Sequence, residues 1–204
     1  MSATQIVAFD RDGNAYVYAE ARNAWRGGHA IWSEMERRHL PRYVPNWLPP
    51  KVSGDQYLRM SDEEIKRHFS FIATRCSSLG DEKGMREVWG LYQKPDVPEY
   101  EQITLLTTLD GVVVMKKDFD QVTRAFIAFG GDTNLPEQIE ILCHMMGNDN
   151  VIACAWNQSS VAGDAWTATD YCDNCEECGG HNRPYNLFKD TGHWIMFEEE
   201  EIDG

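Results

Sequence analysis

The order of the strand-like and helix-like segments is the feature of this chain that most constrains its fold. The two patterns occur in clusters along the 204 residues, whereas a parallel βαβ architecture requires strict alternation. The predicted strands cover residues 5–9, 14–18, 111–116, 151–156 and 193–197, the predicted helices cover residues 22–40, 63–76, 82–92, 117–129 and 136–146, and residues 99–108 fit either. We therefore expect an α+β fold, in which helices pack on a mostly antiparallel sheet, with a small Cys-rich loop near the C-terminus.

The length allows one large domain or two small ones. We expect a single domain over residues 1–204. The alternative is two lobes, a helix-rich lobe over residues 1–97 and an acidic lobe over residues 98–204, because Pro95 and Pro98 bracket a connection.

The charge of the chain is unevenly distributed. The formal net charge is −14, from 19 Lys and Arg against 33 Asp and Glu. Residues 1–80 hold eleven basic and nine acidic side chains, while residues 81–204 hold eight basic and twenty-four acidic ones. Phosphate contacts need cations, so direct nucleic-acid binding by the acidic half is not expected. Its field attracts basic surfaces instead, although solubility alone also explains an acidic composition.

Targeting and membrane signals are not found in the sequence. No run of about 18 apolar residues occurs, so no membrane-spanning helix is expected. The first ten residues, MSATQIVAFD, do not match a basic region followed by a long apolar stretch, so no secretory signal is expected. We expect a cytoplasmic protein whose thiols are reduced, because its six Cys are not spaced as a disulfide framework.

Two carboxylates follow the first apolar run, in the sequence IVAFDRDGNAY. An apolar strand followed by Asp-x-Asp-Gly resembles the first motif of the haloacid-dehalogenase-type phosphotransferases. The resemblance implies a hydrolase or phosphotransferase in which Asp10 is the nucleophile and Asp12 the general acid/base, on a sheet of long parallel strands. The further site residues that the resemblance implies are Thr107 or Thr108, Lys116 or Lys117, and Asp132.

The same residues also satisfy the local preferences of a β-hairpin. Asp, Asn and Gly favour turns, and Gly13 can adopt a positive φ without steric cost. We favour this interpretation, in which Asp10 and Asp12 form the turn between strands 5–9 and 14–18. No catalytic residue is therefore favoured.

A Cys-rich segment carries the most specific chemical pattern in the sequence. Its members recur at every third position and are Cys172, Cys175, Cys178 and His181. Thiolate and imidazole are preferred ligands of structural zinc, so we predict a zinc site here, with Cys154 or His193 as alternative ligands from flanking strands. The other interpretation is an exposed loop with reduced thiols, because Asp, Asn and Gly are typical of loops.

Two weaker patterns complete the candidate sites. Residues 156–160, WNQSS, follow a predicted strand and either line a polar pocket or form a turn anchored by Trp156. Arg37, Arg38 and Arg42 form a small basic patch, which Glu34 and Glu36 largely offset.

Taken together, these patterns favour a non-enzymatic interaction protein. We expect an acidic surface that docks on a basic, nucleic-acid-binding protein partner and is built from Glu176, Glu177, Glu198, Glu199, Glu200 and Glu201. By analogy of charge and size, such a nucleic-acid mimic would be an anti-CRISPR or anti-restriction inhibitor in a host–virus setting, with a nuclease or CRISPR complex as its partner. The alternatives are a hydrolase or phosphotransferase that uses the Asp-x-Asp pair, and a zinc-stabilised regulatory module.

Overall fold

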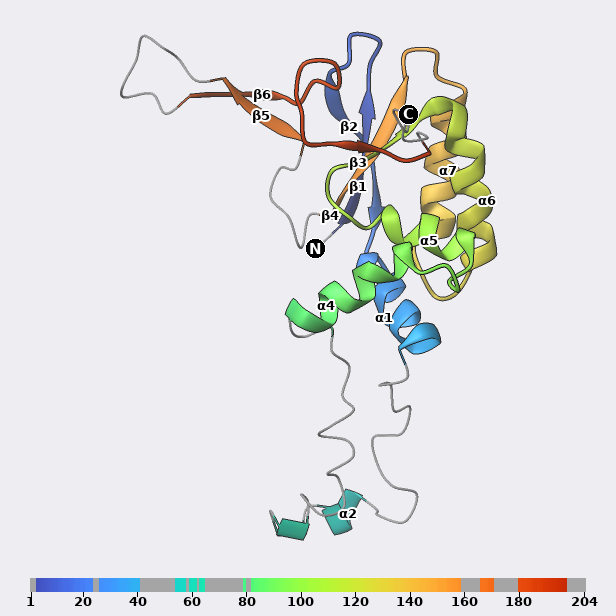
Figure 1. Cartoon of the computed structure of the whole chain (residues 1–204), viewed down its shortest axis with the longest axis vertical. Helices are drawn as coiled ribbons and strands as arrows, with labels where there is room; N and C mark the ends of the chain where they lie inside the picture. The colour runs from blue at the N-terminus through green and yellow to red at the C-terminus, as the bar shows by residue number, and fades with distance from the viewer. Residues whose placement is uncertain are drawn as a thin grey trace, which may run out of the picture. The chain divides into compact units, whose positions relative to one another are not determined.

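The computed structural model describes residues 3–23, 26–40, 54–57, 59–61, 63–64, 79, 82–158, 166–170 and 180–197. The strands are β1 (Ala3–Phe9), β2 (Ala15–Arg22), β3 (Val112–Met115), β4 (Ala153–Gln158), β5 (Thr167–Asp170), β6 (His181–Pro184) and β7 (Trp194–Ile195). The helices are α1 (Gly28–His39), α2 (Gly54–Tyr57), α4 (Glu82–Trp89), α5 (Glu99–Leu106), α6 (Phe119–Phe129) and α7 (Leu135–Met146), and the 3-10 helices are η2 (Gly90–Gln93) and η3 (Lys116–Asp118). The predicted α+β class is confirmed (Figure 1). The predicted Cys-rich loop lies almost entirely outside the described residues.

The main sheet has five strands in the order β2-β1-β4-β3-β7, and β5 pairs with β6 in a separate ribbon. The pairs β1–β2, β1–β4 and β3–β4 are antiparallel, and β3–β7 is parallel. The predicted predominance of antiparallel pairing is therefore confirmed. The register places Val7 beside both Val17 and Ala155, so β1 lies between two antiparallel neighbours.

The chain divides into two compact units. The first comprises Met1–Ile31 with Tyr92–Gly204, and the second comprises Trp32–Leu91. Both sheets and the helices α5 to α7 belong to the first unit. The expected single domain, and its alternative of two lobes that divide at residues 97 and 98, stay predictions.

The second unit contains α4 and most of α1. The ring of Trp32 packs edge-to-face on Trp89, with their centroids 5.8 Å apart. Glu34 accepts hydrogen bonds from Arg37 and Arg38 at 2.8 and 2.7 Å, so it offsets two arginines of the predicted basic patch. The third, Arg42, lies outside the described residues. The bond from Arg37, followed by that from Arg38, lowers the pKa of Glu34 to about 2 against the opposing effect of its partial burial.

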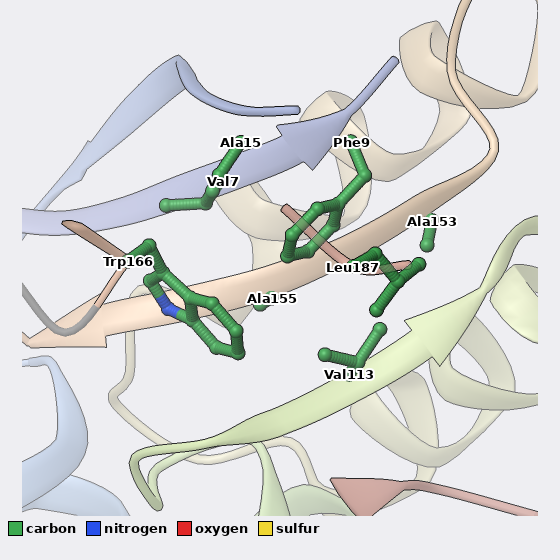
Figure 2. Packing of buried hydrophobic residues seen from close by; sticks show 8 residues of the cluster. All are labelled: Val7, Phe9, Ala15, Val113, Ala153, Ala155, Trp166 and Leu187. Carbon is green, nitrogen blue, oxygen red and sulfur yellow. The ribbon is translucent and has the colours of Figure 1, made fainter. Parts of the chain in front are cut away.

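One face of the main sheet carries an apolar cluster that is completed by two residues from the C-terminal part of the chain. Side chains alternate between the two faces along a strand, and Val7, Phe9 and Val113 fall on the same face. Trp166 and Leu187 lie against them, as Figure 2 shows. Phe9 meets the indole of Trp166 edge-to-face, with ring centroids 5.4 Å apart. The cluster consists of Val7, Phe9, Ala15, Val113, Ala153, Ala155, Trp166 and Leu187.

The opposite face of the sheet is covered by α6 and α7 (Figure 1). The helix α6 places Phe119, Val122 and Phe126 in the core, as the helical spacing of residues 117–129 predicts. Phe126 packs on Trp156 of β4 with their ring centroids 6.3 Å apart, and Trp156 is only 2% exposed. The central strands β1, β3 and β4 are therefore largely buried between two apolar layers.

Some element boundaries differ from those predicted. The helix predicted over residues 22–40 begins only at Gly28, because β2 continues to Arg22. Residues 99–106 form a helix, and the strand predicted over residues 193–197 is reduced to Trp194–Ile195. The predicted capping box is present, since Ser61 Oγ and Glu64 Oε2 bond reciprocally with the backbone.

Candidate functional site

A cleft of about 320 Å³ lies over β1, β2 and β4 and reaches the β5–β6 ribbon. Its apolar lining includes Val7, Val17, Trp166 and Pro184. Trp166 is held in place because its Nε1 donates to the carbonyl of Trp156 at 2.9 Å and its ring also meets Tyr185 edge-to-face. Val17, in contrast, is 53% exposed. The cleft thus combines a fixed indole with an accessible apolar strand position.

Side-chain amides of Gln5, Asn157 and Asn182 form half of the polar lining of the cleft. Asn157 Nδ2 donates to Gln5 Oε1 at 3.0 Å, and Gln5 Nε2 donates to Glu20 Oε1 at 2.9 Å. Asn182 lines the cleft from β6, and its Oδ1 accepts a hydrogen bond from Thr169 at 3.1 Å. Among the described residues, Asn157 Oδ1 is a buried acceptor with no hydrogen-bond partner.

Arg183 brings a positive charge to the cleft, but two carboxylates neutralise it. Its Nη1 and Nη2 donate to the two oxygens of Asp190 at 2.7 Å each, and its Nε donates to Asp170 at 2.8 Å. The Arg183 guanidinium, with the backbone N–H of Asn186, lowers the pKa of Asp190 to about 2. The same bonds to Asp190 and Asp170 raise the pKa of Arg183. Arg183 and Asp190 therefore stay ionised near neutral pH, and the guanidinium is fully engaged by carboxylates, which leaves no free cation for an anionic ligand.

The Asp10–Gly13 segment is a hairpin turn, as favoured from the sequence. Asp10 Oδ1 accepts the backbone N–H groups of Asp12 and Asn14 at 2.9 and 2.8 Å. Gly13 has φ +83°, which confirms the positive value that the turn requires. The Asp10 carboxylate therefore organises its own turn, while Asp12 is exposed.

The turn is fastened to the C-terminal part of the chain. Asn186 Nδ2 donates to the carbonyl of Asp12 at 2.9 Å, and the N–H of Leu187 donates to that of Gly13 at 2.8 Å. The N–H of Ala15 donates to Tyr185 at 2.8 Å. We call this contact between residues 12–15 and 185–187 the terminal clasp.

Gly13→Ala is expected to lower the free energy of unfolding by about 1–2 kcal/mol, because a Cβ makes the positive φ costly. The added Cβ would also lie 2.6 Å from a ring atom of Phe188. Urea unfolding measures the loss. The control is Gly147→Ala, whose φ is −77° and whose nearest neighbour is 3.6 Å away; we expect a change below about 0.5 kcal/mol there. Equal losses at both glycines would contradict the assigned turn.

Four of the remaining residues implied by the phosphotransferase resemblance have structural partners, and the fifth, Lys117, is exposed. Thr107 and Thr108 are buried, and their hydroxyls donate to the helix carbonyls of Thr104 and Leu105. Lys116 Nζ donates to the carbonyl of Asn148 at 2.7 Å, and Asp132 pairs with Arg26 at 2.8 Å. The parallel strands implied by the resemblance are not found around β1, because both of its neighbours are antiparallel.

The helices α5, α6 and α7 form a second candidate surface, here called the acidic helical layer. Its exposed carboxylates are Glu99, Asp120, Glu137 and Glu140. The only Lys or Arg on these three helices is Arg124, which already pairs with Asp120 at 2.9 Å. A groove of about 370 Å³ between α5 and α6 has Glu99, Gln121 and Arg124 as polar lining and Ile103, Ala125 and Ala128 as apolar lining.

The predicted zinc ligands are only partly placed. Cys172, Cys175 and Cys178 lie outside the described residues, and His181 begins β6. Of the alternative ligands, Cys154 is fully buried, so desolvation raises the pKa of its thiol, and His193 Nδ1 lies 2.8 Å from the Tyr185 hydroxyl. No cluster of three or more metal-ligating side chains occurs within the described part of the chain. The zinc site stays a prediction.

The carboxylates predicted to bind a partner, Glu176, Glu177 and Glu198 to Glu201, also lie outside the described residues. Of the cleft residues, Asn157 was suggested by the polar sequence after Trp156, and Trp156 is indeed anchored in the core. Gln5 and Arg183 were not predicted. The available signal for Gln5 was a polar residue at an alternate position of an otherwise apolar strand.

No protein-family model matches the chain, and comparison with curated proteins and with solved structures gives no match either. Within the residues that the structure describes, no helix is both long enough and apolar enough to span a membrane.

Proposed function

We propose that this protein acts by binding, and that its acidic surface docks on a basic, nucleic-acid-binding surface of a protein partner. The observation that carries the proposal is the acidic helical layer, where Arg124 pairs with Asp120 and the exposed carboxylates of Glu99, Glu137 and Glu140 have no Lys or Arg on these helices to balance them. Such a layer presents an uncompensated negative field to solvent. Phosphate-binding surfaces are rich in Lys and Arg, so they are complementary to it.

The groove between α5 and α6 supports this proposal with a shape as well as a charge. Glu99 stands in its lining beside the apolar side chains of Ile103 and Ala125. A long basic side chain of the partner has a charged head, which would pair with Glu99, and an apolar stem, which would pack on Ile103 and Ala125. The small side chains of Ala125 and Ala128 leave the groove open.

An inhibitor of a nuclease or CRISPR complex is the specific form of this proposal, in which the acidic surface occupies the site of the nucleic acid. Cytoplasmic location follows from such a partner and belongs to the same proposal. Structural zinc at the Cys-rich segment is a separate part of the proposal, and metal analysis of the purified protein with and without Cys175→Ser tests it.

The experiment compares two triple variants that remove three negative charges each. Glu99→Gln, Glu137→Gln and Glu140→Gln neutralise the acidic helical layer, while Asp12→Asn, Glu20→Gln and Asp149→Asn neutralise exposed groups on strands and turns. The tagged proteins capture partners from cells of the native source, and duplex nucleic acid is added as a competitor. At roughly 0.5 kcal/mol for each exposed ion pair, the first variant should weaken binding about tenfold.

The expected partner is a basic nucleic-acid-binding protein that duplex nucleic acid displaces and that high salt releases. The control triple variant should retain it. Partners that both variants capture equally, or that nucleic acid does not displace, would contradict the proposal.

A further inference from the structure

We propose that the cleft over β1, β2 and β4 binds a small neutral heterocycle of nucleobase or nucleoside size, with an N–H group directed at Asn157. This site is separate from the acidic helical layer and does not depend on the proposed function. Its volume of about 320 Å³ falls at the lower end of the range for small-molecule sites, roughly 300–1,000 Å³.

The unpaired acceptor of Asn157 points to a ligand that donates a hydrogen bond. Asn157 is 5% exposed, and its Oδ1 is buried without a partner among the described residues. Its Nδ2 is held by Gln5, which is held in turn by Glu20. A buried polar atom left unpaired costs free energy, so such atoms are uncommon in folded proteins. Asn157 lines the cleft, and a ligand donor at the cleft floor would supply the missing bond once the amide turns its oxygen, which has almost no accessible surface, toward the cleft.

The electrostatics of the lining favour a neutral ligand. Arg183 is engaged by both oxygens of Asp190 and by Asp170, so it has no free charge for a phosphate. Tyr16 also lines the cleft, and partial burial raises the pKa of its hydroxyl, which is therefore uncharged at neutral pH. A phosphate-bearing ligand would be repelled further by the net charge of −14.

The side chains of the lining favour a flat ring. The indole of Trp166 is fixed by its hydrogen bond to Trp156 and by its packing on Phe9. Side-chain amides pair with the donor and acceptor edges of nucleobases, and aromatic rings pack on their faces. The combination of Asn157, Asn182 and Trp166 in one lining provides both kinds of contact.

Nuclear magnetic resonance titration of the full chain tests the proposal. The probes are adenosine, guanosine, cytidine and uridine, with adenosine monophosphate and glucose for comparison. The signals to follow are the side-chain amide of Asn157 and the indole N–H of Trp166. At least one nucleoside should shift both signals in a saturable manner, and the monophosphate should not bind more tightly than adenosine. No saturable shift with any nucleoside, or equal shifts with glucose, would overturn the inference.

Two cleft variants separate binding from folding. Asn157→Leu removes the unpaired acceptor at similar size, and it also removes the bond to Gln5, which is partly exposed and can bond to water instead. We therefore expect a folded protein with little change in Tm and at least tenfold weaker nucleoside binding. Val17→Tyr fills the cleft from a position that is 53% exposed and should abolish binding in a folded protein. The control is Asn150→Ala at an exposed loop position, which should keep the affinity within about twofold, because it lies outside the lining.

Wild-type affinity in both cleft variants would overturn the inference. The triple variant of the acidic helical layer should bind nucleosides normally, so failure of the docking proposal and failure of this one give different results.

Discussion

Replacing Trp156 with alanine is expected to lower the free energy of unfolding by about 3–5 kcal/mol. The indole is 2% exposed and packs on Phe126 from α6. Its Nε1 donates to Gln138 Oε1 at 2.8 Å. The substitution therefore opens a cavity between the sheet and the helices, and it also leaves a buried acceptor on α7 without a partner. Urea denaturation followed by circular dichroism measures the loss.

Trp194→Ala is the matched control, because it removes the same side chain from a position that is 46% exposed. Its ring meets Tyr92 in a tilted arrangement with centroids 6.3 Å apart, so we expect a loss below about 1.5 kcal/mol. A similar loss at both positions would mean that Trp156 does not occupy the core between the sheet and α6.

Gln138→Ala is expected to destabilise the fold by about 2–4 kcal/mol, which is large for a polar residue. Gln138 Nε2 donates to Asn134 Oδ1 at 2.8 Å, and its Oε1 accepts from Trp156. All three side chains are less than 5% exposed. The alanine variant leaves the buried Trp156 Nε1–H donor and the buried Asn134 Oδ1 acceptor without partners. Each unpaired group costs roughly 1–3 kcal/mol.

The control for this change is Gln121→Ala on α6, whose amide bonds with exposed Glu99 at 3.2 Å. We expect a loss below about 1 kcal/mol there. A double-mutant cycle with Trp156→Phe sharpens the test, because phenylalanine keeps an aromatic ring but has no N–H. If Gln138→Ala costs as much in the Trp156→Phe background as in the wild type, the hydrogen bond to the indole contributes nothing.

The buried polar network around Gln138 is the part of the fold that was least predictable from the sequence. Asn134 also donates to Thr4 Oγ1 at 3.2 Å, and Thr4 donates to Asn23 at 2.6 Å. Asn and Gln are ordinarily surface residues. The approach of β1, α7 and the end of β2 gives each of them a buried partner, and in two pairs the partners are more than 100 residues apart.

The features that local chemistry determines were predictable. The turn at Gly13 and the helix over residues 119–129 depend on neighbouring side chains, so the sequence alone indicates them. The β5–β6 ribbon was missed because its strands are short and mostly exposed, without the apolar alternation that marks a strand.

The candidate cleft depends on both kinds of information. Asn157 was accessible to sequence reasoning because a polar run follows an apolar strand. The neutralisation of Arg183 was not, since Asp170 lies thirteen residues away along the chain and the pairing follows from the antiparallel register of β5 and β6. Gln5 accepts the hydrogen bond of the Asn157 amide only because the pairing of β1 with β4 places the two residues opposite each other.

The terminal clasp joins residues 12–15 to residues 185–187, which the ribosome synthesises much later. The hairpin of β1 and β2 is complete once Arg22 has emerged, but β4, which pairs with the other edge of β1, begins only at Ala153. Such distant pairings make folding slow. Until Tyr185 and Leu187 leave the exit tunnel, the hairpin exposes the apolar side chains of Val7 and Phe9. We therefore expect the nascent chain to be prone to aggregation and to be bound by chaperones.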